Sequence, residues 1–143
     1  MVTFVLDASA ILRFIDNEIG VERVSEVFQA AVAGQAQVVL SAIHYGEVIG
    51  VSQKRGGPLL VESTAAQLAE LKIQTVPVDQ TRAAKSAIIH VSRKIPYADS
   101  FAAELASDSP DHILITADFD FKPAENDIAI EFLPPKPKSN PKP

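Results

Sequence analysis

The residues of this chain best suited to chemistry are four acids that stand beside apolar segments: Asp7, Glu47, Asp99 and Asp118. Asp7 and Asp118 follow apolar, β-branched runs, and Glu47 and Asp99 lie near the starts of segments with helical periodicity. Carboxylates gathered in a small volume repel one another, and a hard divalent cation such as Mg²⁺ or Mn²⁺ offsets that repulsion. Such a site can hydrolyse a phosphodiester, because the cation generates a nucleophile from water and stabilises the transition state.

Structural roles are the alternative for two of these acids and for a neighbouring serine. Asp7 can begin the turn after its strand and cap the next helix, and Ser9 can cap the same helix. Glu47 has apolar neighbours, among which an unpaired carboxylate is costly. It therefore belongs to a site, or it reaches solvent or pairs with Lys54 or Arg55.

The other two acids have structural alternatives of their own. Asp99 follows Pro96 in the first turn of a predicted helix, where the helix dipole stabilises a carboxylate. Asp118 and Asp120 alternate with aromatic residues after a strand, and a polar turn would account for both. Ligands of open parallel sheets bind at the carboxyl ends of the strands. We therefore expect the acids beside these ends to converge on one site.

The elements that must position the acids alternate between short β-branched runs and longer segments of helical period, as in βαβ units around a parallel sheet. The predicted strands cover residues 2–6, 37–40, 75–78, 112–116 and 128–132. The predicted helices cover residues 9–16, 21–32, 42–54, 58–72, 83–91 and 97–107.

The apolar stripes of residues 21–32 and 83–91 repeat every three or four residues, so both helices should pack on the central sheet. Ser41 and Asp79 are the expected helix N-caps. Gly34 and Gly56 are the expected helix stops.

The composition indicates one domain of modest size. The chain has 143 residues, of which 47% are hydrophobic, enough for a single core. The absence of cysteine excludes disulfides, thiolate metal sites and cysteine nucleophiles. No apolar run approaches the roughly 20 residues that cross a membrane, and the first residues lack the basic start of a signal peptide. We therefore expect a cytoplasmic protein that is not bound to a membrane.

The charge is distributed unevenly along the chain. The net charge is −5, yet the last ten residues hold five prolines, three lysines and no acid. We expect residues 1–133 to form the folded domain and residues 134–143 to form a flexible Pro/Lys-rich tail. Because the folded part is acidic, an RNA phosphate must be met locally, and Arg93 and Lys94 are the candidates. A solvated surface pair is the alternative for these two residues.

Four motifs taken together resemble the PIN-domain family, and within it the VapC type. They are Val5-Leu6-Asp7-Ala8-Ser9-Ala10-Ile11-Leu12, Ser41-Ala42-Ile43-His44-Tyr45-Gly46-Glu47-Val48, Pro96-Tyr97-Ala98-Asp99-Ser100-Phe101-Ala102 and Leu114-Ile115-Thr116-Ala117-Asp118-Phe119-Asp120-Phe121. Each motif is short, but the four follow the family's order and spacing over residues 2–133. The resemblance implies a three-layer α/β/α sandwich around a mainly parallel sheet.

The resemblance also implies a function and the residues that perform it. The function is that of an endoribonuclease dependent on Mg²⁺ or Mn²⁺, the toxin of a type II toxin–antitoxin pair. The acids that match the family's catalytic and metal-binding positions are Asp7, Glu47, Asp99 and Asp118. Ser9 and Thr116 match auxiliary hydroxyls, and Asp120 matches an auxiliary acid. The implied partners are an RNA substrate, a cognate antitoxin protein and a second copy of the chain in a homodimer.

Two other functions compete with this interpretation. A haloacid-dehalogenase-like phosphatase needs a second Asp two residues after its nucleophilic Asp, and this chain has Ser9 there. A non-catalytic PIN-like binding module would have no need of all four acids. The histidines, His44, His90 and His112, share no metal-ligand spacing, so each is expected at the surface or with its hydrogen bonds satisfied.

Overall fold

The core of the molecule is a five-stranded parallel sheet, seen in a computed structural model that describes residues 1–137. Its strands are β1 (Thr3–Leu6), β2 (Gln37–Ser41), β3 (Gln74–Val76), β4 (His112–Thr116) and β5 (Ala129–Phe132). They lie in the order β3-β2-β1-β4-β5, and every neighbouring pair is parallel. The expected fold class is therefore confirmed, and each predicted strand exists with ends that shift by two residues at most.

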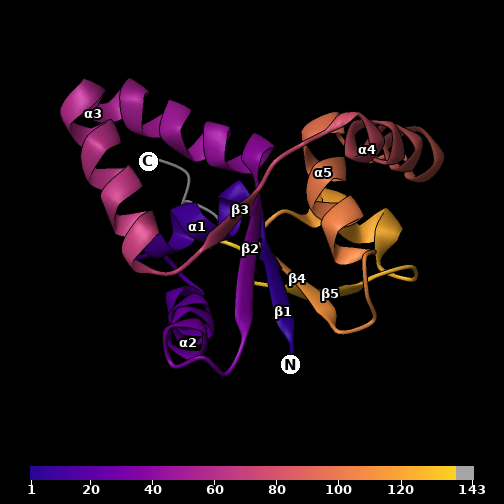
Figure 1. The fold of residues 1–143 in the computed structure, drawn as a ribbon, viewed down its shortest axis with the longest axis horizontal. Helices are drawn as coiled ribbons and strands as arrows, with labels where there is room; N and C mark the ends of the chain where they lie inside the picture. Colours follow the sequence, from indigo (N-terminus) through magenta and orange to yellow (C-terminus); the bar gives the residue numbers. More distant parts are fainter. Residues whose placement is uncertain (138–143) are drawn as a thin grey trace, which may run out of the picture.

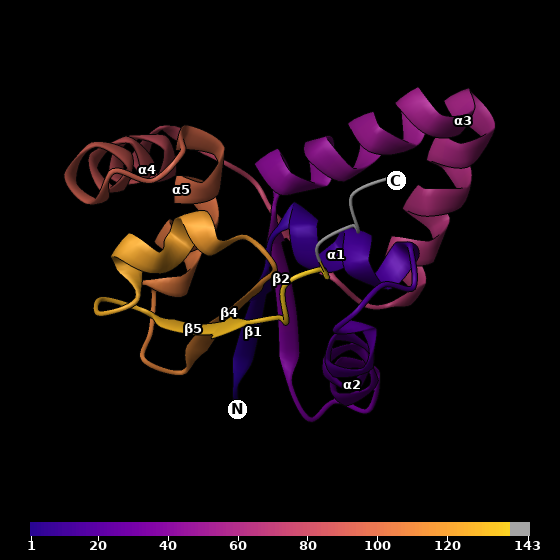
Figure 2. The same cartoon turned by 180° about the vertical axis from the view of Figure 1, so that it is seen from behind.

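Helices cover both faces of the sheet. They are α1 (Ala8–Ile15), α2 (Val21–Val32), α3 (Ala42–Glu70), α4 (Gln80–Arg93) and α5 (Tyr97–Ala106), and the 3₁₀-helix η1 (Phe119–Ala124) precedes β5. Figures 1 and 2 show α1 and α2 on one side of the sheet and α4 and α5 on the other. β1 is consequently buried along its whole length, as a strand covered on both faces must be.

Successive residues of β1 contribute to two separate cores because side chains alternate along a strand. Phe4 and Leu6 pack with α1, α2 and α3, whereas Val5 packs with α5 and with Phe121 of η1. The expectation that the helix over residues 21–32 packs on the sheet is confirmed, since Val24 is fully buried in the first of these cores.

The expectation that the helix over residues 83–91 packs on the sheet is wrong. Ile88 and Val91, which lie on its apolar stripe, are 67% and 73% exposed. α4 packs on α5, and α5 occupies the sheet. An ion pair between Arg82 of α4 and the buried Glu104 of α5, with nitrogen and oxygen 2.8 Å apart, joins the two helices.

α3 consists of two helical arms that meet at a sharp kink, in agreement with the two helices predicted over residues 42–54 and 58–72. Gly57 leaves the helical conformation with φ of 70°, and Pro58 follows it. The stop expected at Gly56 is thus displaced by one residue. A hydrogen bond of 2.9 Å between the hydroxyls of Ser52 and Thr64 ties the two arms together.

The other expected helix ends are confirmed. The side chain of Ser41 caps α3, and that of Asp79 caps α4. Gly34 follows the end of α2 with φ of 75°, a conformation that favours glycine. No helix among residues 1–137 is both long and apolar enough to span a membrane.

The first residue of the predicted tail contacts the folded part of the chain. The buried guanidinium of Arg13 donates hydrogen bonds to the carbonyl oxygens of Ile19 and Pro134, at 2.7 and 2.9 Å. Most of the expected flexible tail, residues 138–143, lies outside the described residues.

Candidate active site

The candidate site lies at the carboxyl ends of β1 and β4, where the strand order reverses. From β1 the chain runs outward through β2 to β3, and it then returns to place β4 on the opposite side of β1. Leu6 at the end of β1 is in register with Ile115 of β4. Asp7 and Thr116, each one residue further on, therefore meet at the point where open parallel sheets bind ligands.

Asp7 is held by hydrogen bonds from three donors. Its Oδ1 accepts from the Ser9 hydroxyl at 2.7 Å and from the backbone N–H of Ala10 at 3.0 Å. Its Oδ2 accepts from the Thr116 hydroxyl at 2.7 Å. Burial raises the pKa of Asp7 above its usual range, although these bonds and the charge of His44 act to lower it. Asp7 is also the N-cap of α1, so the structural role considered for it applies.

The two hydroxyls that donate to Asp7 also fix the loop after β4. Because each gives its proton to Asp7, its oxygen is free to accept from the backbone. The Ser9 oxygen accepts from the N–H of Ala117, and the Thr116 oxygen accepts from the N–H of Asp118, both at 2.9 Å. The turn after β1 and the turn after β4 are thereby joined into one rigid unit.

Three further carboxylates cluster beside this unit. One oxygen from each of Asp99, Asp118 and Asp120 lies within 4.8 Å of the other two. Asp99 stands in the first turn of α5, and Asp118 caps η1 by accepting from the N–H of Asp120 at 2.9 Å. Burial, followed by repulsion from Asp118 and Asp7, raises the pKa of Asp99 to about 7. The cluster is short of positive charge, and its oxygen donors suit a hard divalent cation.

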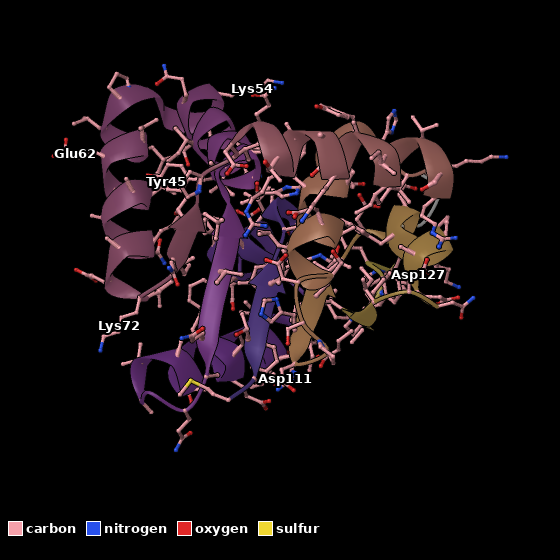
Figure 3. The ribbon with its side chains drawn as sticks, turned by 45° about the vertical axis from the view of Figure 1, so that its right-hand side comes forward. Tyr45, Lys54, Glu62, Lys72, Asp111 and Asp127 are labelled. Carbon is pink, nitrogen blue, oxygen red and sulfur yellow. The ribbon has the colours of Figure 1, made fainter. Side chains whose placement is uncertain are left out.

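Glu47 stands outside this three-acid cluster, with its side chain 46% exposed. The suggested pairing with Lys54 or Arg55 is wrong. Arg55 pairs instead with Asp16, at 2.7 Å between nitrogen and oxygen. Figure 3 shows Lys54 and Glu62 extending outward from the two arms of α3. The contact that Glu47 makes is with His44, whose Nδ1 lies 2.6 Å from Oε1 of Glu47.

His44 is the site residue that the sequence analysis missed. Its side chain is 1% exposed, and neither ring nitrogen has a partner in a well-formed hydrogen bond among the described residues. Burial lowers the pKa of His44, but Glu47, Asp7 and Asp99 together raise it above its ordinary value. The available signal was spacing, because residues three apart on a helix share a face and His44 precedes Glu47 by three.

The other two histidines behave as expected. Nδ1 of His112 lies 2.9 Å from the carbonyl oxygen of Leu105, and Nδ1 of His90 contacts that of Ile95. Both rings therefore have a backbone partner, unlike the ring of His44.

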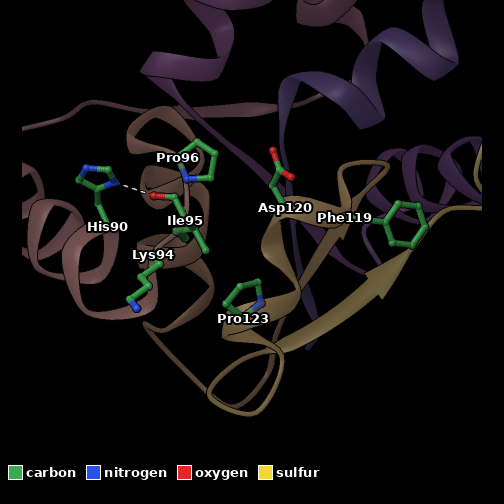
Figure 4. A pocket seen from close by; sticks show the side chains of 7 residues that line it. All are labelled: His90, Lys94, Ile95, Pro96, Phe119, Asp120 and Pro123. Carbon is green, nitrogen blue, oxygen red and sulfur yellow. Dashed lines mark hydrogen bonds between the residues drawn. The ribbon is translucent and has the colours of Figure 1, made fainter.

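A pocket of about 590 Å³ adjoins the three-acid cluster and shares Asp120 with it. It is lined by His90, Lys94, Ile95, Pro96, Phe119, Asp120 and Pro123. In Figure 4, Pro96 and Asp120 lie toward one end of the pocket and Lys94 and Pro123 toward the other.

The two residues proposed from sequence for phosphate contact are separated by the fold. Lys94 adopts the left-handed conformation at the end of α4, with φ of 57°, and lines the pocket. Arg93 pairs with Asp127, labelled in Figure 3, at 2.7 Å between Nε and Oδ2.

Comparisons with solved structures show the same architecture. A chain in VapBC2 from Rickettsia felis, bound to a DNA fragment from its promoter, superposes with a TM-score of 0.71 at 14% identity, covering 92% of this chain and 99% of that one. A chain in DNA-bound VapBC from Salmonella typhimurium gives 0.67 at 19% identity, covering 92% and 98%. A chain of FitAcB from Neisseria gonorrhoeae gives 0.64 at 23% identity, covering 89% and 95%.

Comparisons of the sequence were made as well as comparisons of the fold. No curated protein matches the chain. The family model of the PIN domain, however, matches residues 4–126, a span that runs from β1 past the acids after β4. Most of the chain is covered by this match, and the chain belongs to the PIN domain family.

Proposed function

We propose that this protein is an endoribonuclease dependent on Mg²⁺ or Mn²⁺, and that it is the toxin of a toxin–antitoxin pair. The observation that carries the proposal is the cluster of Asp99, Asp118 and Asp120, with oxygens within 4.8 Å of one another. The pKa of Asp99 is raised first by burial and then by repulsion from Asp118 and Asp7, and a bound cation would offset both effects. Family membership supports the nuclease chemistry.

The donor set fits a hard divalent cation. Asp99, Asp118 and Asp120 would hold it, with Asp7 and Glu47 beside them. Oδ2 of Asp7 accepts a single hydrogen bond, from Thr116, and so keeps a lone pair for the site. When bound, the cation supplies the positive charge that activates water and stabilises the leaving oxygen of a phosphodiester.

The protein's own residues prepare that site. Ser9 and Thr116 hold the Asp7 carboxylate in one orientation, and their second hydrogen bonds hold the loop that carries Asp118. The acids are thus placed before substrate arrives, so little reorganisation is needed during the reaction. Asp120 extends the cluster toward the neighbouring pocket.

The pocket beside the cluster is the proposed path of the RNA. Its volume of about 590 Å³ is large enough for a nucleotide. Lys94 would contact a backbone phosphate as the strand passes toward the acids. Arg93 is less available for this role, because its guanidinium is engaged by Asp127.

The proposed partners follow from the neighbours and from the surface. Several similar structures are toxin–antitoxin complexes, which supports an antitoxin partner for this chain in the cytoplasm. An apolar hollow of about 310 Å³, lined in part by Phe14, Phe28 and Leu71, offers a surface for such a partner. The exposed Ile88 and Val91 on α4 support a homodimer, which light scattering would measure.

The test is cleavage of labelled total RNA by the wild-type protein and by Asp99→Asn, each with Mg²⁺, with Mn²⁺ and with chelator. We expect cleavage by the wild type alone and only with a cation. Equal cleavage by both proteins would assign the activity to a contaminant. Hydrolysis of a small phosphomonoester without RNA cleavage would favour a phosphatase, and cation-free RNA binding without cleavage would favour a binding module.

A further inference from the structure

The carboxylate cluster does not by itself explain why His44 is a histidine. The ring is almost wholly buried, its Nε2 has no hydrogen-bond partner among residues 1–137, and its Nδ1 lies beside a carboxylate oxygen of Glu47. A buried polar group without a partner is unfavourable, and an apolar side chain of similar size would fill the same space without that cost. The imidazole must therefore serve something other than packing.

The surroundings of His44 indicate what it serves. His44 and Glu47 lie three residues apart on α3, and the ring is buried where the carboxylate is nearly half exposed. Nδ1 lies 2.6 Å from Oε1 of Glu47. Nε2 is buried and has no hydrogen-bond partner among the described residues, so the contact of the ring that bears on the site is the one with Glu47.

Glu47 needs such support to take part in the site. Nearly half of its side chain is exposed, and a long carboxylate on a helix surface has many solvated rotamers. Neither nearby cation restrains it, since Arg55 is paired with Asp16 and Lys54 extends outward (Figure 3). The contact with His44 is the restraint that the described residues provide.

We propose that His44 is a positioning residue of the cation site, and that the contact of its buried Nδ1 with Oε1 of Glu47, at 2.6 Å, restrains the Glu47 carboxylate for its part in that site. This inference rests on the proposed function and extends it to a residue that family membership does not assign. A carboxylate that holds a cation is itself commonly held by a second hydrogen bond, and loss of such support lowers metal affinity by about 10- to 100-fold.

The test is a titration of Mn²⁺ into the full chain without RNA, followed by the electron paramagnetic resonance of free Mn²⁺. The proteins are wild type, His44→Leu, His44→Gln, Glu47→Gln and the double variant His44→Leu with Glu47→Gln. His112→Asn is the matched control, because it removes a ring bonded to the backbone away from the acids. Thermal melts in chelator establish that each variant is folded.

We expect His44→Leu to weaken Mn²⁺ binding by about 10- to 100-fold, and His44→Gln to recover part of the loss through its amide N–H. The double variant should bind no more weakly than Glu47→Gln alone, because His44 acts through Glu47. If His44→Leu does not fold, the same cycle is built with His44→Gln.

Two results would overturn the inference while leaving the proposed function intact. One is wild-type affinity in the His44 variants. The other is a loss in the double variant equal to the sum of the two single losses, which would show that His44 acts independently of Glu47. Failure of the wild type to bind Mn²⁺ would instead overturn the proposed cation site and this inference with it.

Discussion

Replacing Asp99 by asparagine removes one charge from a crowded cluster with little change of shape, so its effect on stability measures the cost of burying that charge among other acids. The pKa of Asp99 is raised from 3.8 to about 7 by burial and by the charges of Asp118 and Asp7. The folded protein therefore binds a proton at Asp99 more tightly than the unfolded chain does. Without a cation, the wild type should lose stability relative to Asp99→Asn as the pH rises from 4 to 7.

The size of this effect follows from the same pKa values. The difference between 3.8 and about 7 corresponds to a ceiling of roughly 4 kcal/mol. Asp99 is partly exposed, so solvent screening reduces the expected stabilisation by Asp99→Asn to about 1–2 kcal/mol above pH 7. Near pH 4 the carboxyl is protonated in the folded protein and still about half protonated in the unfolded chain, so the two proteins should differ little. Folding raises the pKa of this acid, so ionising the carboxyl destabilises the folded protein. The free energy of unfolding of the wild type therefore falls as the pH rises.

The assay is urea unfolding of both proteins in chelator at several pH values from 4 to 8, repeated with Mg²⁺. At a cation concentration of about 100 times the dissociation constant, the wild type should gain about 2.7 kcal/mol. Asp99→Asn should gain much less. A difference between the two proteins that does not change with pH, or a variant less stable than the wild type at pH 8 in chelator, would refute the reasoning.

Three further predictions concern a hydrogen bond to Asp7, the proposed path of the RNA and the exposed face of α4. Thr116→Val should destabilise the protein by about 1–3 kcal/mol in urea unfolding, because it removes a buried hydrogen bond to Asp7, and a loss below about 0.5 kcal/mol would contradict this. Lys94→Glu should raise KM for RNA about three- to tenfold with kcat little changed, whereas the control Lys85→Glu on α4 should not; equal effects would argue against the proposed path. At protein concentrations too low for the proposed homodimer, Val91→Lys should change stability by less than about 0.5 kcal/mol, because Val91 is exposed in the single chain, and a larger loss would show that its face of α4 is covered within the chain.

Much of the fold is encoded locally and could be predicted. The runs that form β1 and β4 are continuously apolar because both faces of the sheet are covered, and that pattern survives in the sequence alone. The caps Ser41 and Asp79 could be predicted for a similar reason, since each bonds a backbone N–H two or three residues away. The acids that follow β1 and β4 could be placed because parallel strands bring their carboxyl ends to one edge.

The packing of α4 could not be predicted in this way. Periodicity shows which face of a helix is apolar but not what covers that face. The small residues of α5 bring this helix onto the sheet, so α4 becomes an outer helix, and the stripe that includes Ile88 and Val91 is left largely exposed.

In the candidate site, too, some features could be predicted from the sequence and others depend on the packing of the chain. By itself the sequence determined which carboxylates stand at the strand ends, because strand and acid adjoin along the chain. Only the tertiary structure decided that Asp120 joins Asp99 and Asp118, that Glu47 stands apart with His44, and that Arg93 is paired with Asp127. Those choices depend on the distances between side chains from separate elements, which local periodicity does not specify and the packing of the whole chain does.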